Sequence, residues 1–90
     1  MRGHIKGDAA ALRAIMRKAR HIDISSRLEA TKQFGLVEDY RIEWREKSLC
    51  PPRVIIRGRS SFPEQITRNY VTSLIGHLVP TREIVITRDH

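Results

Sequence analysis

The β-sheet of the fold is predicted from residues 36–58, LVEDYRIEWREKSLCPPRVIIRG, because their hydrophobic pattern has the period of a β-strand. Tyr40, Ile42 and Trp44 alternate with charged residues, which predicts a half-buried strand with a charged outer face. We therefore expect Tyr40 and Trp44 to belong to the core. Residues 47–52 are expected to form a loop, since two adjacent prolines cannot pair inside a sheet.

A second strand is predicted at 53–58, antiparallel to the first, with Val54 and Ile56 facing inward. The two strands then form a β-hairpin. A register that sets arginine opposite arginine is unfavourable, because like charges repel across a strand pair. The register that we prefer places Glu43 opposite Arg57.

The chain before this hairpin has a helical period. An apolar stripe at positions i, i+3, i+4 and i+7 predicts a helix over 9–20 with the stripe facing a core. Asp8 precedes this helix and can cap it. The next residues, HIDIS at 21–25, are β-branched at alternate positions and predict a break. The stripe comprises Leu12, Ile15, Met16 and Ala19.

A second short helix is expected at 27–34, ending at Gly35, which favours the turn that follows a helix. Ser26 and Glu29 have the spacing of a capping box. The N-terminal region is thus predicted to be a helix, bent at the break, or a helical hairpin. Its match to a DNA-binding helix-turn-helix is poor, because the second helix has little apolar periodicity.

After the hairpin, the sequence predicts a long amphipathic helix. Ser61 and Glu64 again have capping-box spacing, Pro63 lies in the first turn, and Pro80 ends the helix. Its apolar face comprises Ile66, Tyr70, Val71, Leu74, Ile75 and Leu78. A final strand at 82–89 lies either parallel beside the second strand or antiparallel beside the first.

The predicted fold class is α+β. An N-terminal helix or helical hairpin, a β-hairpin, a long amphipathic helix and a final strand build a three-stranded sheet with helices packed on one face. Ninety residues are enough for one small domain, residues 1–90. A homodimer is among the expected states, because association would bury additional apolar area.

Charge is the most informative bulk property of the chain. Seventeen Lys and Arg residues against ten Asp and Glu give a net charge of +7. The excess lies in the first two thirds of the chain, which predicts one basic side and a negatively charged partner. Arginine outnumbers lysine, and its guanidinium binds phosphate in a bidentate manner.

The candidate nucleic-acid-binding residues belong to the first helix and to the outer face of the hairpin. They are Arg13, Arg17, Lys18, Arg20, Arg41, Arg45, Arg53, Arg57 and Arg59. A further candidate for contact with a single phosphate is the turn at Gly58, Ser60 and Ser61, just before the amphipathic helix. The capping box already explains this turn, so phosphate contact would be a second role. No P-loop or dinucleotide-binding motif is present.

Catalytic and metal-binding constellations are weak. The four histidines lack ligand spacing, and Cys50 is the only cysteine, so we expect no metal, no cofactor and no intrachain disulfide. Cys50 also has no histidine near it in sequence. The expectation is therefore a protein that is not an enzyme.

We expect a small, basic, non-enzymatic nucleic-acid-binding protein that contacts DNA or RNA phosphates through the basic helix and hairpin face. The alternative is a protein-interaction module or inhibitor that docks its basic face on a nucleic-acid-handling protein complex. A further alternative is a small ribonuclease of toxin type using Arg68, Tyr70 and His77. The lack of a long apolar run predicts no membrane span, and the single cysteine favours the cytoplasm.

Overall fold

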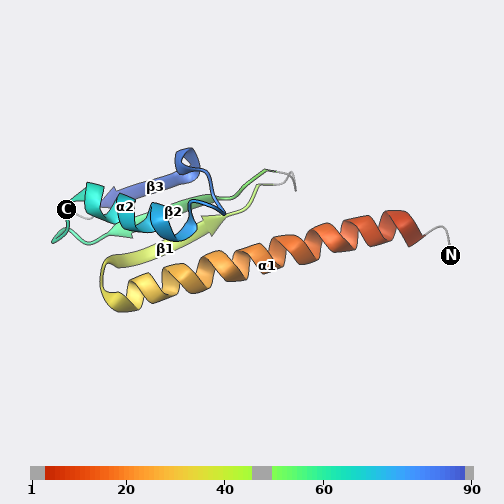
Figure 1. Ribbon diagram of the computed structural model, residues 1–90, viewed down its shortest axis with the longest axis horizontal. Helices are drawn as coiled ribbons and strands as arrows, with labels where there is room; N and C mark the ends of the chain where they lie inside the picture. Colours follow the sequence, from red (N-terminus) through yellow and green to blue (C-terminus); the bar gives the residue numbers. More distant parts are fainter. Residues whose placement is uncertain (1–3, 46–49, 89–90) are drawn as a thin grey trace.

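The chain forms an α+β fold, as predicted, in a computed structural model that describes residues 4–45 and 50–88, with side chains at 10–45 and 50–88 (Figure 1). In chain order its elements are α1 (His4–Phe34), β1 (Val37–Glu43), β2 (Arg53–Gly58), α2 (Glu64–Ile75), the 3₁₀ turn η1 (Thr81–Glu83) and β3 (Ile84–Arg88). Half of the predicted hairpin loop, residues 47–49, lies outside the described residues.

Helix α1 is continuous over 31 residues, so the predicted break at 21–25 and the helical hairpin are wrong. Ile24, Leu28 and Thr31 occupy one side of the helix and are at most 1% exposed. Burial of this side against the sheet outweighs the weak helix preference of β-branched residues.

The predicted caps within this region are also wrong, because the residues lie inside α1. Asp8 is helical, since α1 begins at His4. The Ser26 hydroxyl donates to the carbonyl of Asp23, and Glu29 accepts a hydrogen bond from the hydroxyl of Tyr40, 2.9 Å away. Glu29 therefore links α1 to β1 instead of capping a helix.

Gly35 ends α1, as predicted. Its φ of 96° lies in the left-handed region, which favours glycine. The amide of Gly35 donates to the carbonyl of Lys32, and the amide of Leu36 donates to the carbonyl of Thr31. These bonds close the helix and turn the chain directly into β1.

The sheet has the strand order β1-β2-β3, with β1 and β2 antiparallel and β2 and β3 parallel. Of the two predicted positions for the last strand, the chain thus adopts the one beside β2, connected through α2. The predicted register was wrong: Glu43 lies opposite Arg53, and Asp39 lies opposite Arg57. This register sets both β2 arginines opposite a carboxylate, which is favourable across an antiparallel pair.

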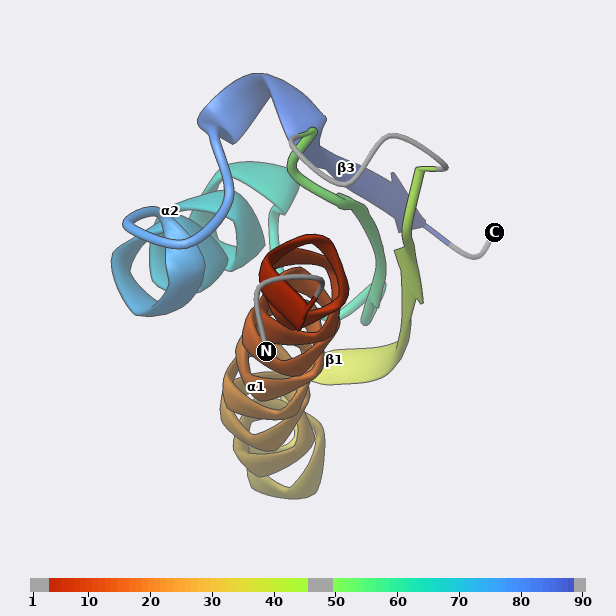
Figure 2. The same cartoon turned by 90° about the vertical axis from the view of Figure 1, so that its right-hand side faces the viewer.

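Both helices cover one face of the sheet and leave the other face open (Figure 2). The core lies between the layers and contains nine hydrophobic residues that are at most 3% exposed. They are Ile24, Leu28, Val37, Val54, Ile56, Val71, Ile75, Val79 and Ile84. The inward orientation of Val54 and Ile56 was predicted correctly.

The start of α2 differs from its prediction. Pro63 is the N-cap residue, and no side chain caps the helix, so Ser61 and Glu64 form no capping box. The carbonyl of Pro63 accepts hydrogen bonds from the amides of Ile66 and Thr67. The helix also ends at Ile75, well before the predicted stop at Pro80.

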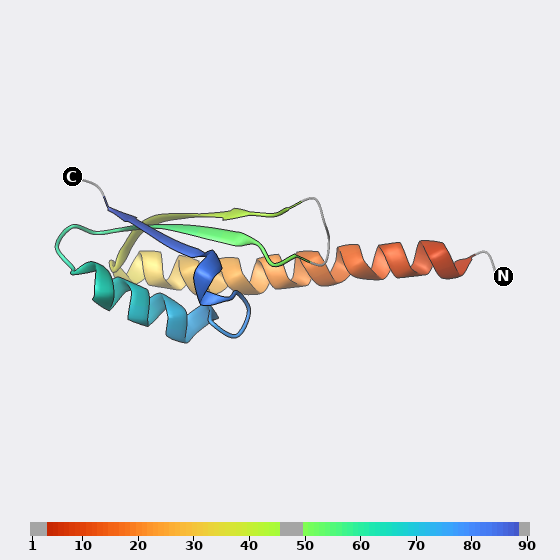
Figure 3. The same ribbon diagram turned by 90° about the horizontal axis from the view of Figure 1, so that it is seen from above.

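The N-terminal half of α1 projects beyond the sheet (Figures 1 and 3). The molecule is accordingly elongated, 58 × 22 × 20 Å. Leu12, Ile15 and Met16 are 56%, 63% and 57% exposed, so the prediction that their stripe faces the core is wrong. They precede the part of α1 that lies against the sheet. None of the described helices is long and apolar enough to cross a membrane.

Candidate nucleic-acid interface

The projecting half of α1 is the most strongly basic segment of the described chain. Residues 10–22 contain four Lys and Arg residues and no Asp or Glu. Arg13, Lys18 and Arg20 are exposed there and form no ion pair with another residue that the structure describes. Their charges are therefore available to an anionic partner.

Arg17 differs from these three cations because it is packed against the end of β1. Its guanidinium lies 5.0 Å from the centroid of the Trp44 ring, and it donates a hydrogen bond to the carbonyl of Arg45. Its Nε is buried without a partner among the described residues. Arg17 thus holds Trp44 and the end of β1 against α1, in addition to carrying charge.

Trp44 lies outside the hydrophobic core, contrary to its prediction, whereas Tyr40 packs against the core as predicted. The indole Nε1–H of Trp44 donates to Nδ1 of His21, 2.8 Å away, and the two ring centroids are 6.2 Å apart. The Trp44 side chain is partly exposed.

Two open hollows meet at Trp44. One, of about 420 Å³, is lined by Ala14, Arg17, Lys18, His21 and Trp44. The other, of about 310 Å³, is lined by Glu43, Trp44, Arg45 and Arg53. We call the combined surface of Arg17, Lys18, His21, Trp44, Arg45 and Arg53 the Trp44 junction. It places an aromatic ring among five basic side chains drawn from α1, β2 and the end of β1.

Glu83 partly neutralises this junction, whereas Glu43, which also lines the second hollow, is paired with Arg41. The carboxylate oxygen of Glu83 lies 2.8 Å from Nη2 of Arg45 and 3.7 Å from Nε of Arg53. The Glu83 side chain is only 13% exposed, while the two arginine side chains are about half exposed. Two guanidinium groups share one carboxylate, so a positive charge remains at this site.

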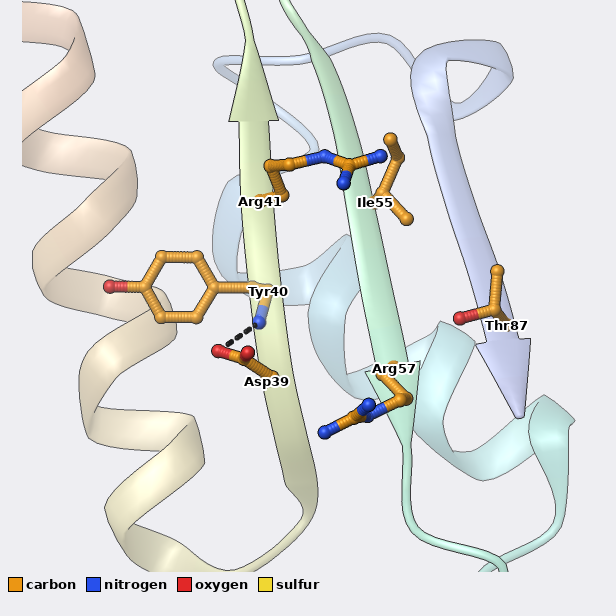
Figure 4. A pocket seen from close by; sticks show the side chains of 6 residues that line it. All are labelled: Asp39, Tyr40, Arg41, Ile55, Arg57 and Thr87. Atoms are coloured by element: carbon orange, nitrogen blue, oxygen red, sulfur yellow. Dashed lines mark hydrogen bonds between the residues drawn. The ribbon is translucent and has the colours of Figure 1, made fainter. Parts of the chain in front are cut away.

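The open face of the sheet carries a second, mixed cluster (Figure 4). Arg41 reaches from β1 across β2 toward Ile55, and Arg57 reaches back toward Asp39. These residues and Thr87 border a hollow of about 280 Å³. Arg41 is paired with Glu43 at 2.9 Å, so this face is less basic than its arginine content predicts.

Asp39 remains ionised in this cluster. Its carboxylate accepts a hydrogen bond from the backbone amide of Tyr40 at 2.9 Å, and the ammonium of Lys32 lies 3.5 Å away. The Tyr40 amide, and then the charge of Lys32, hold the pKa of Asp39 below its ordinary value of 3.8. A fixed negative charge therefore lies beside Arg57.

The predicted phosphate turn lies at the other end of β2 from the Trp44 junction. A strand rises about 3.3 Å per residue, so Gly58 is roughly 16 Å from Arg53. Gly58 is buried, and a Cβ there would lie 3.4 Å from the Thr67 side chain, so this glycine permits close packing of α2. Arg59, Ser60 and Ser61 are exposed.

The residues considered for a ribonuclease do not converge on one side of α2. Arg68 and Tyr70 are two positions apart in the helix, so they point roughly 160° apart. Arg68 is paired with Glu64, and Tyr70 contacts the ring of Phe34. The described residues also contain no cluster of three side chains able to hold a metal ion.

The sequence reasoning missed the Trp44 junction because His21 and Trp44 are 23 positions apart. Only a continuous helix through 21–25 brings them together. Comparison of the chain with protein-family models, with curated proteins and with solved structures finds no match to any of them.

Proposed function

We propose that the protein binds the phosphate backbone of nucleic acid, without cleaving it, through the projecting half of α1 and the adjoining Trp44 junction. The observation that supports this most is the exposed group Arg13, Lys18 and Arg20 in a stretch without carboxylates. Cations that lack an intramolecular partner can exchange their counterions for phosphates, and that exchange drives binding.

The arrangement of these cations suits an extended polyanion. Arg13 and Arg20 are seven residues apart, so they lie on the same side of α1, roughly 10 Å apart along its axis. Arg45 and Arg53 continue the basic surface beyond Trp44. A backbone that follows α1 toward the sheet would thus meet basic side chains along its whole path.

Trp44 provides a place for a base beside this path. Trp44 lines both hollows and is partly exposed, although Arg17 lies 5.0 Å from the centroid of its ring. Stacking of a base on an aromatic ring is worth about 1–3 kcal/mol and depends little on sequence. Arg41, Arg57 and Arg59 are secondary candidates for phosphate contact, because they lie on the open face and at the far turn.

The experiment is fluorescence anisotropy with labelled double-stranded DNA, single-stranded DNA and RNA over a series of salt concentrations. The proposal predicts a steep loss of affinity with salt, with a log–log slope of about −0.9 per phosphate for double-stranded DNA. Absence of binding to all three probes at low salt would contradict it. The basic surface would then be a docking site for an acidic protein complex.

The proposed function includes a cytoplasmic location, which the single cysteine Cys50 favours. A second copy of the chain is a further candidate partner. It would use the opposite, apolar side of α1.

A further inference from the structure

The exposed apolar stripe of α1 continues for about one turn beyond Ala19, to Ile22. Leu12, Ile15, Met16 and Ile22 are 56–63% exposed, and Ala19 lies between them. A single exposed apolar residue needs no explanation, but a row of four large ones along one helix indicates an interaction surface. Nothing among the described residues covers this row.

The stripe faces away from the rest of the protein. At about 100° per residue, Leu12, Ile15, Ala19 and Ile22 fall within a sector of about 80° around α1. The buried residues Ile24, Leu28 and Thr31 are centred roughly 165° from the middle of that sector. A partner can therefore pack along the stripe without displacing the sheet or α2.

The spacing of the stripe is that of a coiled coil. In the heptad abcdefg, Leu12 and Ala19 occupy position a, and Ile15 and Ile22 occupy position d. Lys18 then occupies position g, and Asp23 occupies the next position e. In a parallel pair of helices, the residue at position g of one helix faces the residue at position e of the following heptad in the other helix.

We propose that α1 packs along this stripe against α1 of a second copy of the chain, as a parallel two-stranded coiled coil. Lys18 of each copy then pairs with Asp23 of the partner subunit, giving two symmetric ion pairs. The Asp23 side chain is 42% exposed and bonded to Arg27 on one oxygen, so it remains accessible to this lysine. In an antiparallel pair, g residues face g residues and the charges do not match.

The heptad positions also explain how the two bodies fit. Ile24, Thr31 and Leu28 are at positions f and c, which lie on the outside of a coiled coil. A two-fold axis along the seam therefore places the two sheets on opposite outer sides. Arg13 and Arg20, at position b, remain exposed in the dimer. Lys18, by contrast, pairs with the partner subunit, so the dimer leaves Arg13 and Arg20 of the basic group to bind nucleic acid. Dimerisation does not depend on the proposed nucleic-acid binding.

The first test is sedimentation equilibrium of the protein over a wide concentration range, without nucleic acid. The wild type is expected to change from monomer to dimer with increasing concentration, since a seam of about two heptads is short. I15D/I22D is expected to remain a monomer with the wild-type circular dichroism spectrum, because both side chains are exposed in the monomer. I66D, which places the same charge on another exposed isoleucine, is expected to dimerise normally.

The second test determines the orientation of the helices. K18E sets a second carboxylate opposite Asp23 of the partner subunit and is expected to raise the dimer dissociation constant about fivefold, while K18E/D23K restores it. A wild type that stays monomeric at every concentration would overturn the proposal. A dimer unaffected by I15D/I22D, or one whose affinity K18E leaves unchanged, would overturn it as well.

Discussion

Nε1 of Trp44 lies 2.8 Å from Nδ1 of His21, and this hydrogen bond joins the end of β1 to the middle of α1. Arg17 supports the same contact from one turn earlier in α1, because its guanidinium lies over the indole ring. The projecting half of α1 is therefore attached to the sheet by Trp44, on the N-terminal side of Ile24, the first core residue of the helix.

Trp44→Phe tests this attachment. The variant keeps an aromatic ring but removes the indole N–H, so Nδ1 of His21 loses its donor. The expected loss is about 1 kcal/mol in the free energy of unfolding, measured by urea denaturation. Trp44→Ala is expected to cost more, since it also removes the ring under Arg17. Equal stability of Trp44→Phe and the wild type would show that the hydrogen bond does not stabilise the fold.

Ile24 and Ile22 provide a matched pair on one helix. Ile24 is fully buried, and Ile22 is 58% exposed, although both lie within the predicted break. Ile24→Ala is expected to lower the free energy of unfolding by about 2–4 kcal/mol, because it leaves a cavity in the core. Ile22→Ala is expected to change it by less than about 0.5 kcal/mol at protein concentrations that keep the chain monomeric. Similar losses in both variants would contradict the orientation of α1.

Asp39→Asn tests the charge on the open sheet face. The folded-state pKa of Asp39 is lowered, so its ionised form stabilises the fold above the ordinary pKa of 3.8. This stabilisation is lost as the pH falls through the folded-state pKa. The wild type is therefore expected to be more stable than Asp39→Asn at pH 6, and the difference is expected to shrink below pH 3.8. Thermal unfolding of both proteins across this range measures it, and a constant difference would contradict the account.

Glu83→Gln separates stability from binding. The substitution removes the carboxylate that holds Arg45 and Arg53 but keeps the shape of the side chain. Because the arginines are half exposed, the stability loss is expected to stay below about 1 kcal/mol. Affinity for labelled nucleic acid is expected to rise roughly threefold, since two guanidinium groups are released for phosphates. Weaker binding with normal stability would show that Glu83 positions the arginines for the ligand.

The strands and the core residues of β2 were predictable, because alternation of apolar and charged residues has one simple explanation in a half-exposed sheet. The core residues of α1 were not predicted, since the stripe that was expected to be buried is exposed. Tyr40, Val54 and Ile56 pack as their pattern indicates. The register was less predictable, since sliding the strands in either direction avoids arginine pairs. Only the observed register also sets Glu43 and Asp39 opposite the two arginines of β2.

The candidate interface was predictable in composition but not in arrangement. The basic residues of α1 are evident in the sequence, whereas their proximity to Trp44 depends on a helix that continues through HIDIS. Local preference favours a break there, and burial of Ile24 and Leu28 decides against it. The apolar stripe was recognised, but its period does not reveal whether the surface that covers it belongs to the same chain.

The most direct test of the proposed function compares two variants that lose the same charge at opposite ends of the molecule. R13A/R20A removes two cations from the projecting half of α1, and K32A/R88A removes two from the ends of α1 and β3. Circular dichroism first establishes that both variants fold like the wild type.

Anisotropy with the nucleic acid that the wild type binds best then gives the affinity and its salt dependence. R13A/R20A is expected to bind at least tenfold more weakly and, on double-stranded DNA, to have a log–log slope smaller by about 1.8. K32A/R88A is predicted to bind nearly as the wild type does. Equal losses in the two variants would contradict the account, because binding would then follow net charge and not the surface along α1.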